Sequence, residues 1–254
     1  MKLSEFTKIS IRESLSGIFG AISIAFWLIT VYPQLIENYK RKSGDSLSLH
    51  FLCLWLIGDI FSLIGSIWGK LISVIIAVQV YFFLADLLLI LQILYYKRKP
   101  SLRSKVRLST LKGATLSQFF VSLAVVIIFG ILGWIITVLM GGIKKPELEY
   151  NGSSGFLVVG YIGSFFYLFA RIPQIIKNYK SKSTDGLSPL FFAFTVLGNL
   201  TYIVSILLID ISRKYILINL PWLLSSFGTL FMDFLIFAQF ISYRRRRKSE
   251  GSSN

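Results

Sequence analysis

The sequence predicts an all-α membrane protein of seven transmembrane helices, built as two parallel three-helix repeats joined by a linker helix (3+1+3). Composition, the placement of Lys and Arg, and an internal repeat predict this class. Hydrophobic residues make up 54% of the 254 residues, charged residues 15%, and the mean hydropathy is +0.69. Soluble domains carry about 25% charged residues, so this chain has too few polar residues to cover a soluble surface. The composition excludes a disordered chain and a nucleic-acid-binding arm.

Seven apolar stretches are long enough to cross a bilayer, which takes about 20 residues of helix. The first is as long as a span, so no cleavable signal peptide is expected. Together the stretches occupy nearly the whole chain and leave no room for a soluble domain. Their approximate limits are 16–39, 47–68, 71–96, 118–140, 155–178, 187–209 and 217–242.

The positive charges lie mainly on one side of this arrangement. Of 27 Lys and Arg residues, 18 fall on the side of the loop at 97–112 and the C-terminal tail, and 8 on the other side. Cytosolic loops are the basic ones, so the N-terminus is expected in the lumen and the C-terminus in the cytosol. The net charge of +15 is then an orientation signal. It favours contact with membrane lipid and not with nucleic acid.

The chain repeats itself at an offset of 140 residues. The segment Pro33-Gln34-Leu35-Ile36-Glu37-Asn38-Tyr39-Lys40 returns as Pro173-Gln174-Ile175-Ile176-Lys177-Asn178-Tyr179-Lys180. A second match at an offset of 147 relates Asp86, Gln92 and Tyr96 to Asp233, Gln239 and Tyr243. Each repeat therefore comprises three spans.

Three crossings reverse the chain, so an additional span must restore its direction before the second copy begins. The span at about 118–140 does this and has no counterpart in the repeat. Parallel repeats of this kind occur in transporters, with the substrate site between the halves near the middle of the membrane. The expected organisation is a lumenal N-terminus (1–15), a first repeat (16–96), a basic loop, linker helix and lumenal loop (97–154), a second repeat (155–243) and a basic cytosolic tail (244–254).

Polar residues within the spans are the candidate functional residues. A charged side chain at the centre of a membrane helix costs about 2.5–3.5 kcal/mol on insertion scales, which packing alone does not explain. Arg171 also lies within a span and could pair with one carboxylate at most. Helical spacing groups the polar residues into faces that are expected to meet at a hydrated centre. The candidates for coupling to substrate or protons are Asp59, Asp86, Asp233, Asn199, Gln79 and Thr229.

An aromatic pocket of Trp55, Tyr202 and Trp222 would add cation–π attraction for a positively charged solute. Taken singly, each of these rings fits a packing role equally well. Asp59 aligns with Asn199 across the repeat, so one half carries a charge where the other can only form hydrogen bonds. Asp59 and Asp233 are the first choices for coupling.

The two Pro-Gln pairs, Pro33-Gln34 and Pro173-Gln174, lie near the cytosolic ends of their spans. Proline removes a backbone donor and kinks a helix. A single kink would favour a static bend, whereas matched kinks in both repeats indicate a hinge or gate. The glutamines are expected to bond the freed carbonyls or to face the substrate path.

In these motifs the sequence resembles the PQ-loop family, and within it the lysosomal and vacuolar cationic amino acid transporters. The supporting residues are the doubled Pro-Gln, Arg171-Ile172-Pro173-Gln174, Asp185-Gly186-Leu187-Ser188, Gly198-Asn199-Leu200-Thr201-Tyr202 and Leu220-Pro221-Trp222-Leu223-Leu224. The resemblance implies export of Lys, Arg or His from the vacuole or lysosome to the cytosol by alternating access, with proton coupling left open. The wider family includes cystine and sugar carriers.

Two other interpretations remain beside transport of cationic amino acids: a seven-helix nutrient receptor or sensor of the same ligands, and a PQ-loop carrier of another small solute such as cystine. The internal repeat favours a carrier, while the loop at 97–117 could dock a cytosolic protein. No enzyme motif is present, and with one His and one Cys neither a metal site nor a cofactor is expected. The sequon at Asn151 in a lumenal loop is a glycosylation site or a chance tripeptide.

Overall fold

The computed structural model describes residues 10–68, 73–99, 116–139 and 155–251, and all regular structure in these ranges is helical. Seven stretches are long and apolar enough to cross a membrane, as predicted, and α1 with α2 forms the first of them. The helices are α1 (Ile11–Thr30), α2 (Tyr32–Arg41), α3 (Leu49–Trp68), α4 (Ser73–Arg98), α5 (Leu116–Leu139), α6 (Gly155–Ser181), α7 (Pro189–Ile209) and α8 (Arg213–Gly251).

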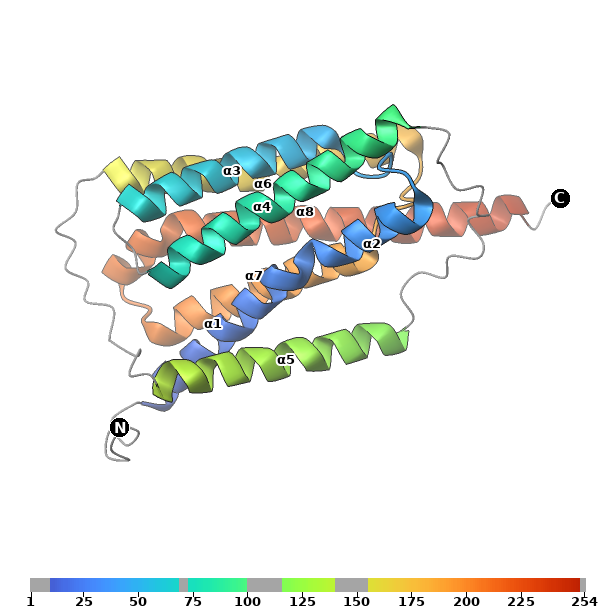
Figure 1. Cartoon of the computed structure of the whole chain (residues 1–254). Coiled ribbons are helices and arrows are strands. Elements are labelled where there is room, and N and C mark those ends of the chain that lie inside the picture. Colours follow the sequence, from blue (N-terminus) through green and yellow to red (C-terminus); the bar gives the residue numbers. More distant parts are fainter. Residues whose placement is uncertain (1–9, 69–72, 100–115, 140–154, 252–254) are drawn as a thin grey trace.

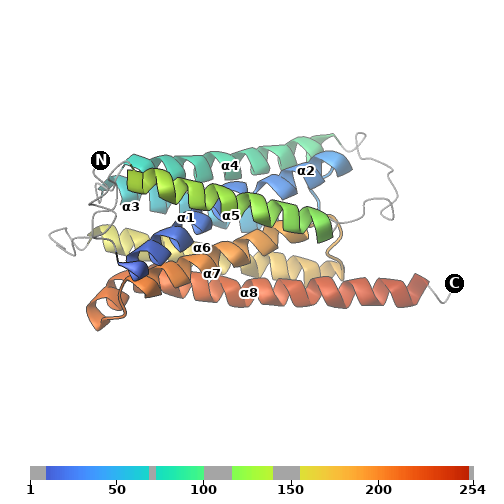
Figure 2. The same cartoon turned by 90° about the horizontal axis from the view of Figure 1, so that it is seen from below.

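Six spans form a ring, and the seventh lies outside it (Figures 1 and 2). Around the ring, α1 packs on α7, α7 on α8, α8 on α6, α6 on α3, and α3 on α4, which returns to α2. Each repeat contributes three neighbouring helices, so the two repeats meet at α1–α7 and at α3–α6. The linker helix α5 packs mainly against α1, in a core cluster that also includes Phe194 of α7. This is the 3+1+3 arrangement that the internal repeat predicts.

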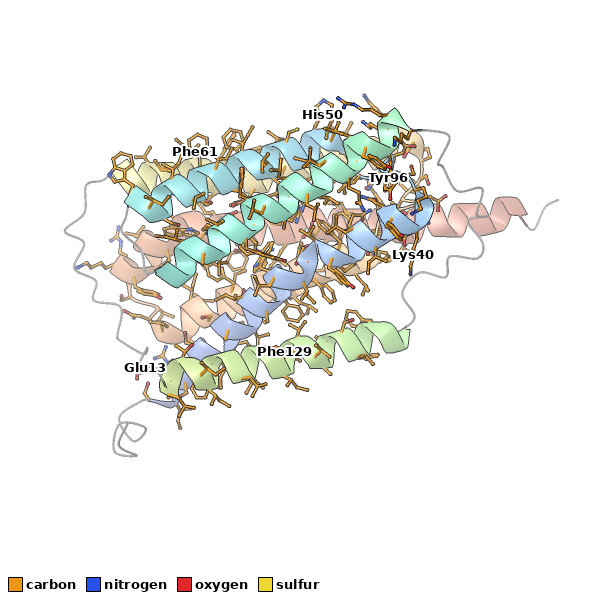
Figure 3. The ribbon with its side chains drawn as sticks, viewed as in Figure 1. Glu13, Lys40, His50, Phe61, Tyr96 and Phe129 are labelled. Atoms are coloured by element: carbon orange, nitrogen blue, oxygen red, sulfur yellow. The ribbon has the colours of Figure 1, made fainter. Side chains whose placement is uncertain are left out.

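The two ends of the bundle are distinct. Figure 3 places Lys40, His50 and Tyr96 at one end, with Glu13 at the other. The C-terminal part of α8 continues past the Lys40 end (Figure 1). The loops that follow the two Pro-Gln motifs meet at the Lys40 end, since Gln34 bonds Gly186 and Gln174 bonds Ser46. We call this the Pro-Gln end.

The N-terminus of α1 carries a capping box. The backbone N–H of Glu13 donates to Ser10 Oγ at 3.2 Å, and the N–H of Ser10 donates to Glu13 Oε2 at 2.9 Å. These bonds satisfy backbone donors that the helix itself leaves unpaired. The chain thus enters the first span at a defined residue.

The two prolines occupy different backbone settings. The first span breaks at Val31, and Pro33 lies in the first turn of α2, where its missing N–H costs nothing. Pro173 lies inside the continuous helix α6. The N–H groups of Gln34 and Leu35 both donate to Val31 O, at 3.2 and 3.1 Å, which tightens the turn at the break. The repeats are alike in sequence here but not in helix continuity.

The last helix is longer than its apolar stretch. α8 extends from Arg213 to Gly251, whereas hydropathy marks only Trp222–Tyr243. The predicted span of 217–242 agrees with this apolar stretch to within a few residues, and the helix continues beyond it at both ends, because polar turns can extend a helix past its apolar part. Part of the basic tail expected at 244–254 is helical.

Candidate functional site

Arg171 on α6 and Asp233 on α8 form a fully buried ion pair. Arg171 Nε donates to Asp233 Oδ1 at 2.7 Å. The second carboxylate oxygen, Oδ2, accepts from Thr195 Oγ1 on α7 at 2.7 Å. All three residues are 0% exposed, and they join the three helices of the second repeat at one point.

Aromatic rings surround the Arg171 guanidinium. Its Cζ lies 4.8 Å from the ring centroids of both Phe51 and Trp55 on α3, and 5.9 Å from that of Phe192 on α7. Such rings attract a cation electrostatically where water is scarce. In this structure the cation that these rings contact is thus the protein's own Arg171 and not a substrate. Trp55 was predicted for the aromatic pocket, whereas Phe51 and Phe192 were not.

A second group of acids lies beside this pair. Tyr167 Oη on α6 donates to Asp59 Oδ1 on α3 at 2.7 Å. Among the described residues, the carboxyl group of Asp86 is the remaining hydrogen-bonding neighbour of Asp59, and no other donor meets Asp59 Oδ2. Asp86 on α4 is buried, and its charged neighbours are Asp59 and Arg171. The structure therefore brings the three predicted carboxylates and Arg171 together into one buried group, which we call the charged cluster.

The other predicted residues lie at varying distances from the charged cluster. Thr229 is buried one turn before Asp233 on α8, and Asn199 donates to Thr195 O at 2.9 Å. Gln79 on α4 is half-buried, and its Oε1 meets no donor within the described part of the chain. Asn199 lies one turn from Thr195, Thr229 one turn from Asp233, and Gln79 seven residues before Asp86 on the same helix.

Tyr202 and Trp222 do not join Trp55. Tyr202 packs in a separate core with Ile203 and Tyr215, and it stands seven residues beyond Thr195, about 10 Å along the helix axis. Trp222 faces Gly160 on α6, with Trp222 Cζ2 3.5 Å from the position that a Cβ would take. The three predicted aromatics therefore do not form one pocket in this structure.

The charged cluster breaks the symmetry of the repeat. At the offset of 140, Arg171 aligns with Val31, Tyr167 with Trp27, and Asn199 with Asp59. The second repeat carries the cation and the phenol, while the first carries the additional carboxylate. The cluster is complete only when both repeats contribute.

The two Pro-Gln glutamines bind the opposite repeat. Gln34 Nε2 donates to Gly186 O at 3.0 Å, and Gln34 Oε1 accepts from Ser188 N at 2.8 Å. Gln174 Nε2 donates to Ser46 O at 3.2 Å, and Gln174 Oε1 accepts from Ser48 N at 2.6 Å. Both side chains are 0% exposed. One expectation was that these glutamines bond the carbonyls that proline frees, but neither does. Each glutamine instead forms hydrogen bonds with the loop of the other repeat.

A second layer supports each glutamine. Gln34 also donates to Asn38 Oδ1 at 2.9 Å, and Asn38 Nδ2 donates to Gln92 Oε1 at 3.0 Å. The second repeat has the same chain from Gln174 to Asn178 at 2.8 Å and from Asn178 to Gln239 at 2.8 Å. We call these paired networks the glutamine latch. They close the Pro-Gln end, and the matches of Gln92 with Gln239 and of Asn38 with Asn178 were the sequence signal for them.

The opposite end of the α1–α7 interface is also bonded across the repeats. Ser16 Oγ donates to Ser205 O and Ser205 Oγ donates to Ser16 O, each at 2.8 Å. Farther along, Ser23 Oγ donates to Gly198 O at 2.9 Å. The repeats are therefore bonded near both ends of the bundle, and the residues of the charged cluster are at most 4% exposed.

Residues missed by sequence reasoning complete the site. Tyr167 gave no signal because tyrosine is common in apolar spans that contact lipid headgroups. Phe51 and Phe192 look like ordinary core residues. Only their position beside Arg171 distinguishes them. The sequon at Asn151 and most of the loop at 97–117 lie outside the described residues.

Known proteins resemble this chain over nearly its whole length. A model of the PQ loop repeat matches residues 15–74 and 156–213. The vacuolar lysine transporter YPQ1 of Saccharomyces cerevisiae is 34% identical over 93% of this chain and 96% of its own length. The vacuolar histidine transporter YPQ3 of the same yeast is 34% identical over 92% and 93%.

A relative from another kingdom gives the same picture. The lysosomal amino acid transporter 1 homolog of Homo sapiens is 35% identical over 89% of this chain and 81% of its own length. The relatives are transporters and not enzymes, and both repeats of this chain match the repeat model. The chain belongs to the PQ-loop family, in its group of vacuolar and lysosomal amino acid transporters.

Proposed function

We propose that this chain is a secondary transporter that exports Lys, Arg and His from a vacuole or lysosome to the cytosol. The printed activities of its relatives, which include lysine, histidine and arginine/histidine transport, support this substrate class. The observation that carries the proposal is the charged cluster, which places two carboxylates without a bonded cation in the interior of the bundle.

The charges of the charged cluster fit a cationic solute. Asp233 is committed to Arg171 and Thr195, so Asp59 and Asp86 remain to neutralise a substrate cation. A desolvated cation requires such a partner, because an isolated buried charge is costly. Asp59 and Asp86 on the first repeat are therefore the proposed site for the side-chain charge of the substrate, with protons competing for the same carboxylates.

Alternating access would act through the two closed ends. The glutamine latch joins the repeats at the Pro-Gln end, and the Ser16–Ser205 bonds join them at the other. Opening one end while the other stays closed exposes the charged cluster to one side only. The junction at Val31 between α1 and α2 is the proposed hinge on the side of Pro33 and Gln34, with Pro173 and Gln174 as the partner half of the proposed gate.

Transport assays in proteoliposomes test this proposal. Purified protein should exchange radiolabelled Arg, Lys and His, and should not exchange Ala or glucose. A pH gradient imposed with and without a membrane potential separates proton coupling from uniport. Exchange of cystine in place of the cationic amino acids would favour the alternative that Cystinosin of Drosophila melanogaster, 24% identical over 97% of this chain, represents.

Binding without flux would support a nutrient sensor instead. The structure favours transport over sensing because its interior charges lie between two repeats held at both ends, an arrangement that suits alternate opening. The proposed address is a vacuolar or lysosomal membrane with the C-terminus in the cytosol. If glycosidase treatment changes the electrophoretic mobility of the wild-type protein but not of Asn151→Gln, Asn151 is glycosylated and its loop lies in the lumen.

A further inference from the structure

The guanidinium of Arg171 has two nitrogens without a partner. Both are buried within a residue that is 0% exposed, and neither Nη1 nor Nη2 forms a hydrogen bond with any residue that the structure describes. Asp233 uses only Nε, through one of its oxygens, and its other oxygen is bonded to Thr195. An arginine carries five N–H donors, so the terminal edge holds four that no described residue satisfies. Leaving buried charged donors unpaired is costly.

The surroundings restrict what could meet this edge. Phe51, Trp55 and Phe192 lie 4.8, 4.8 and 5.9 Å from Cζ, measured to their ring centroids, and they offer no oxygen acceptor. Asp86 is a charged neighbour but makes no hydrogen bond with Arg171. A ligand with two adjacent anionic oxygens would satisfy both nitrogens at once, because carboxylates bind the guanidinium fork in a bidentate manner.

We propose that the terminal edge of Arg171 binds the α-carboxylate of the amino acid substrate, while Asp59 and Asp86 take its positive charges. This inference rests on the proposed function and extends it to the part of the substrate that all amino acids share. Arg171 has no counterpart in the first repeat, where Val31 stands, so the chain has one such edge in this position and binds one carboxylate. Asp233 is then a positioning residue that holds the guanidinium by Nε.

The arrangement predicts discrimination against cations that lack a carboxylate. Lysine methyl ester keeps both ammonium groups but has no anionic oxygen, and cadaverine lacks the carboxyl group altogether. Hydrogen bonds between charged groups change affinity by about 10–100-fold. Unlabelled lysine should therefore compete in counterflow of radiolabelled lysine about 10–100-fold better than either analogue.

The test uses the purified full-length chain in proteoliposomes and the double variant Arg171→Gln/Asp233→Asn, which removes both charges of the pair together. In this variant lysine should compete no better than its methyl ester or cadaverine, so the preference falls to about one. Arg171→Lys keeps the charge but loses the fork, and should retain an intermediate preference. Asp233→Asn alone should weaken the preference less than the double variant does.

The results separate the two proposals. Equal competition by lysine and both analogues in the wild type overturns the carboxylate site and leaves cation transport intact. An undiminished preference for lysine in the double variant also overturns it. If the double variant fails to fold, Arg171→Lys and the wild-type preference still decide. Absence of lysine exchange by the folded wild-type protein refutes the proposed function itself.

Discussion

Gln34 and Gln174 make the same hydrogen bonds in opposite directions across the two repeats. Gln34 bonds Gly186 and Ser188 of the second loop, and Gln174 bonds Ser46 and Ser48 of the first. Ser46 and Gly186 meet where the loops cross: a Cβ on Gly186 would lie 2.9 Å from Ser46 Cβ. Gly186 also has φ of 86°, which a residue with a side chain rarely adopts. The glutamines of the two Pro-Gln motifs thus each bond the loop of the opposite repeat.

Removing either glutamine should open the Pro-Gln end. Gln34→Met or Gln174→Met leaves a buried backbone N–H and carbonyl unpaired, at a cost of about 1–3 kcal/mol each. Ser188, 6% exposed, then becomes reachable. In a Cys53→Ser background, maleimide labelling of Ser188→Cys should accelerate similarly in both variants.

Asn219→Ala is the matched control for the latch. It removes an amide bond to Tyr215 O within α8, and should leave the labelling rate unchanged. Labelling that responds to neither glutamine would show that the latch does not close this end.

Cross-linking Ser16 to Ser205 should lock the opposite end. Their hydroxyl oxygens lie 3.3 Å apart, a separation that suits replacement by a disulfide. In the Cys53→Ser background, Ser16→Cys/Ser205→Cys should transport normally when reduced and lose flux when oxidised. The single cysteine variants are the controls. Full flux in the oxidised double variant would mean that this interface does not open during transport.

Gly130→Ala should destabilise the contact between α5 and α1. The added Cβ would lie 2.7 Å from Ile22 Cα, and overpacking against backbone costs about 1–3 kcal/mol. Gly133→Ala has nothing within 4 Å and should gain a few tenths to about 1 kcal/mol from helix propensity. Thermal unfolding in detergent should give a Tm below that of the wild type for Gly130→Ala but not for Gly133→Ala. Equal Tm values for the two variants would argue against the packing of the linker helix.

Tyr167→Phe should weaken substrate exchange by about 10-fold, because Asp59 loses the charge-assisted hydrogen bond that orients it. Counterflow of radiolabelled lysine measures the loss. Tyr161→Phe on the same helix, with an exposed side chain, is the control. Equal exchange in both variants would exclude Tyr167 from the site.

The sequence predicted the positions of the helices better than the places where a helix is interrupted. Hydropathy located seven spans, because a membrane helix needs an apolar length that few other elements need. It did not distinguish Pro33, at the start of α2, from Pro173, inside α6, because the local sequences are nearly identical. Which helix breaks depends on packing against other elements, which sequence spacing does not record.

The sequence predicted the charged residues of the site but not the residues that contact them. The cost of burial singled out Asp59, Asp86, Asp233 and Arg171, and the structure groups them. The partners depend on distances between helices: Tyr167, on α6, meets Asp59 only because α3 and α6 adjoin. Tyr202 and Trp222 shared helical faces with cluster residues but lie at another depth, since a face specifies direction around a helix and not position along the bundle.

Counterflow of radiolabelled arginine by Asp59→Asn tests the central claim most directly. Asp59 is one of the two carboxylates proposed to neutralise the substrate cation, so its loss should reduce exchange by about 10-fold or more. Asp45→Asn, an exposed loop carboxylate, should exchange arginine like the wild type. Asp59→Asn protein that exchanges arginine at the wild-type rate at every pH would contradict the account.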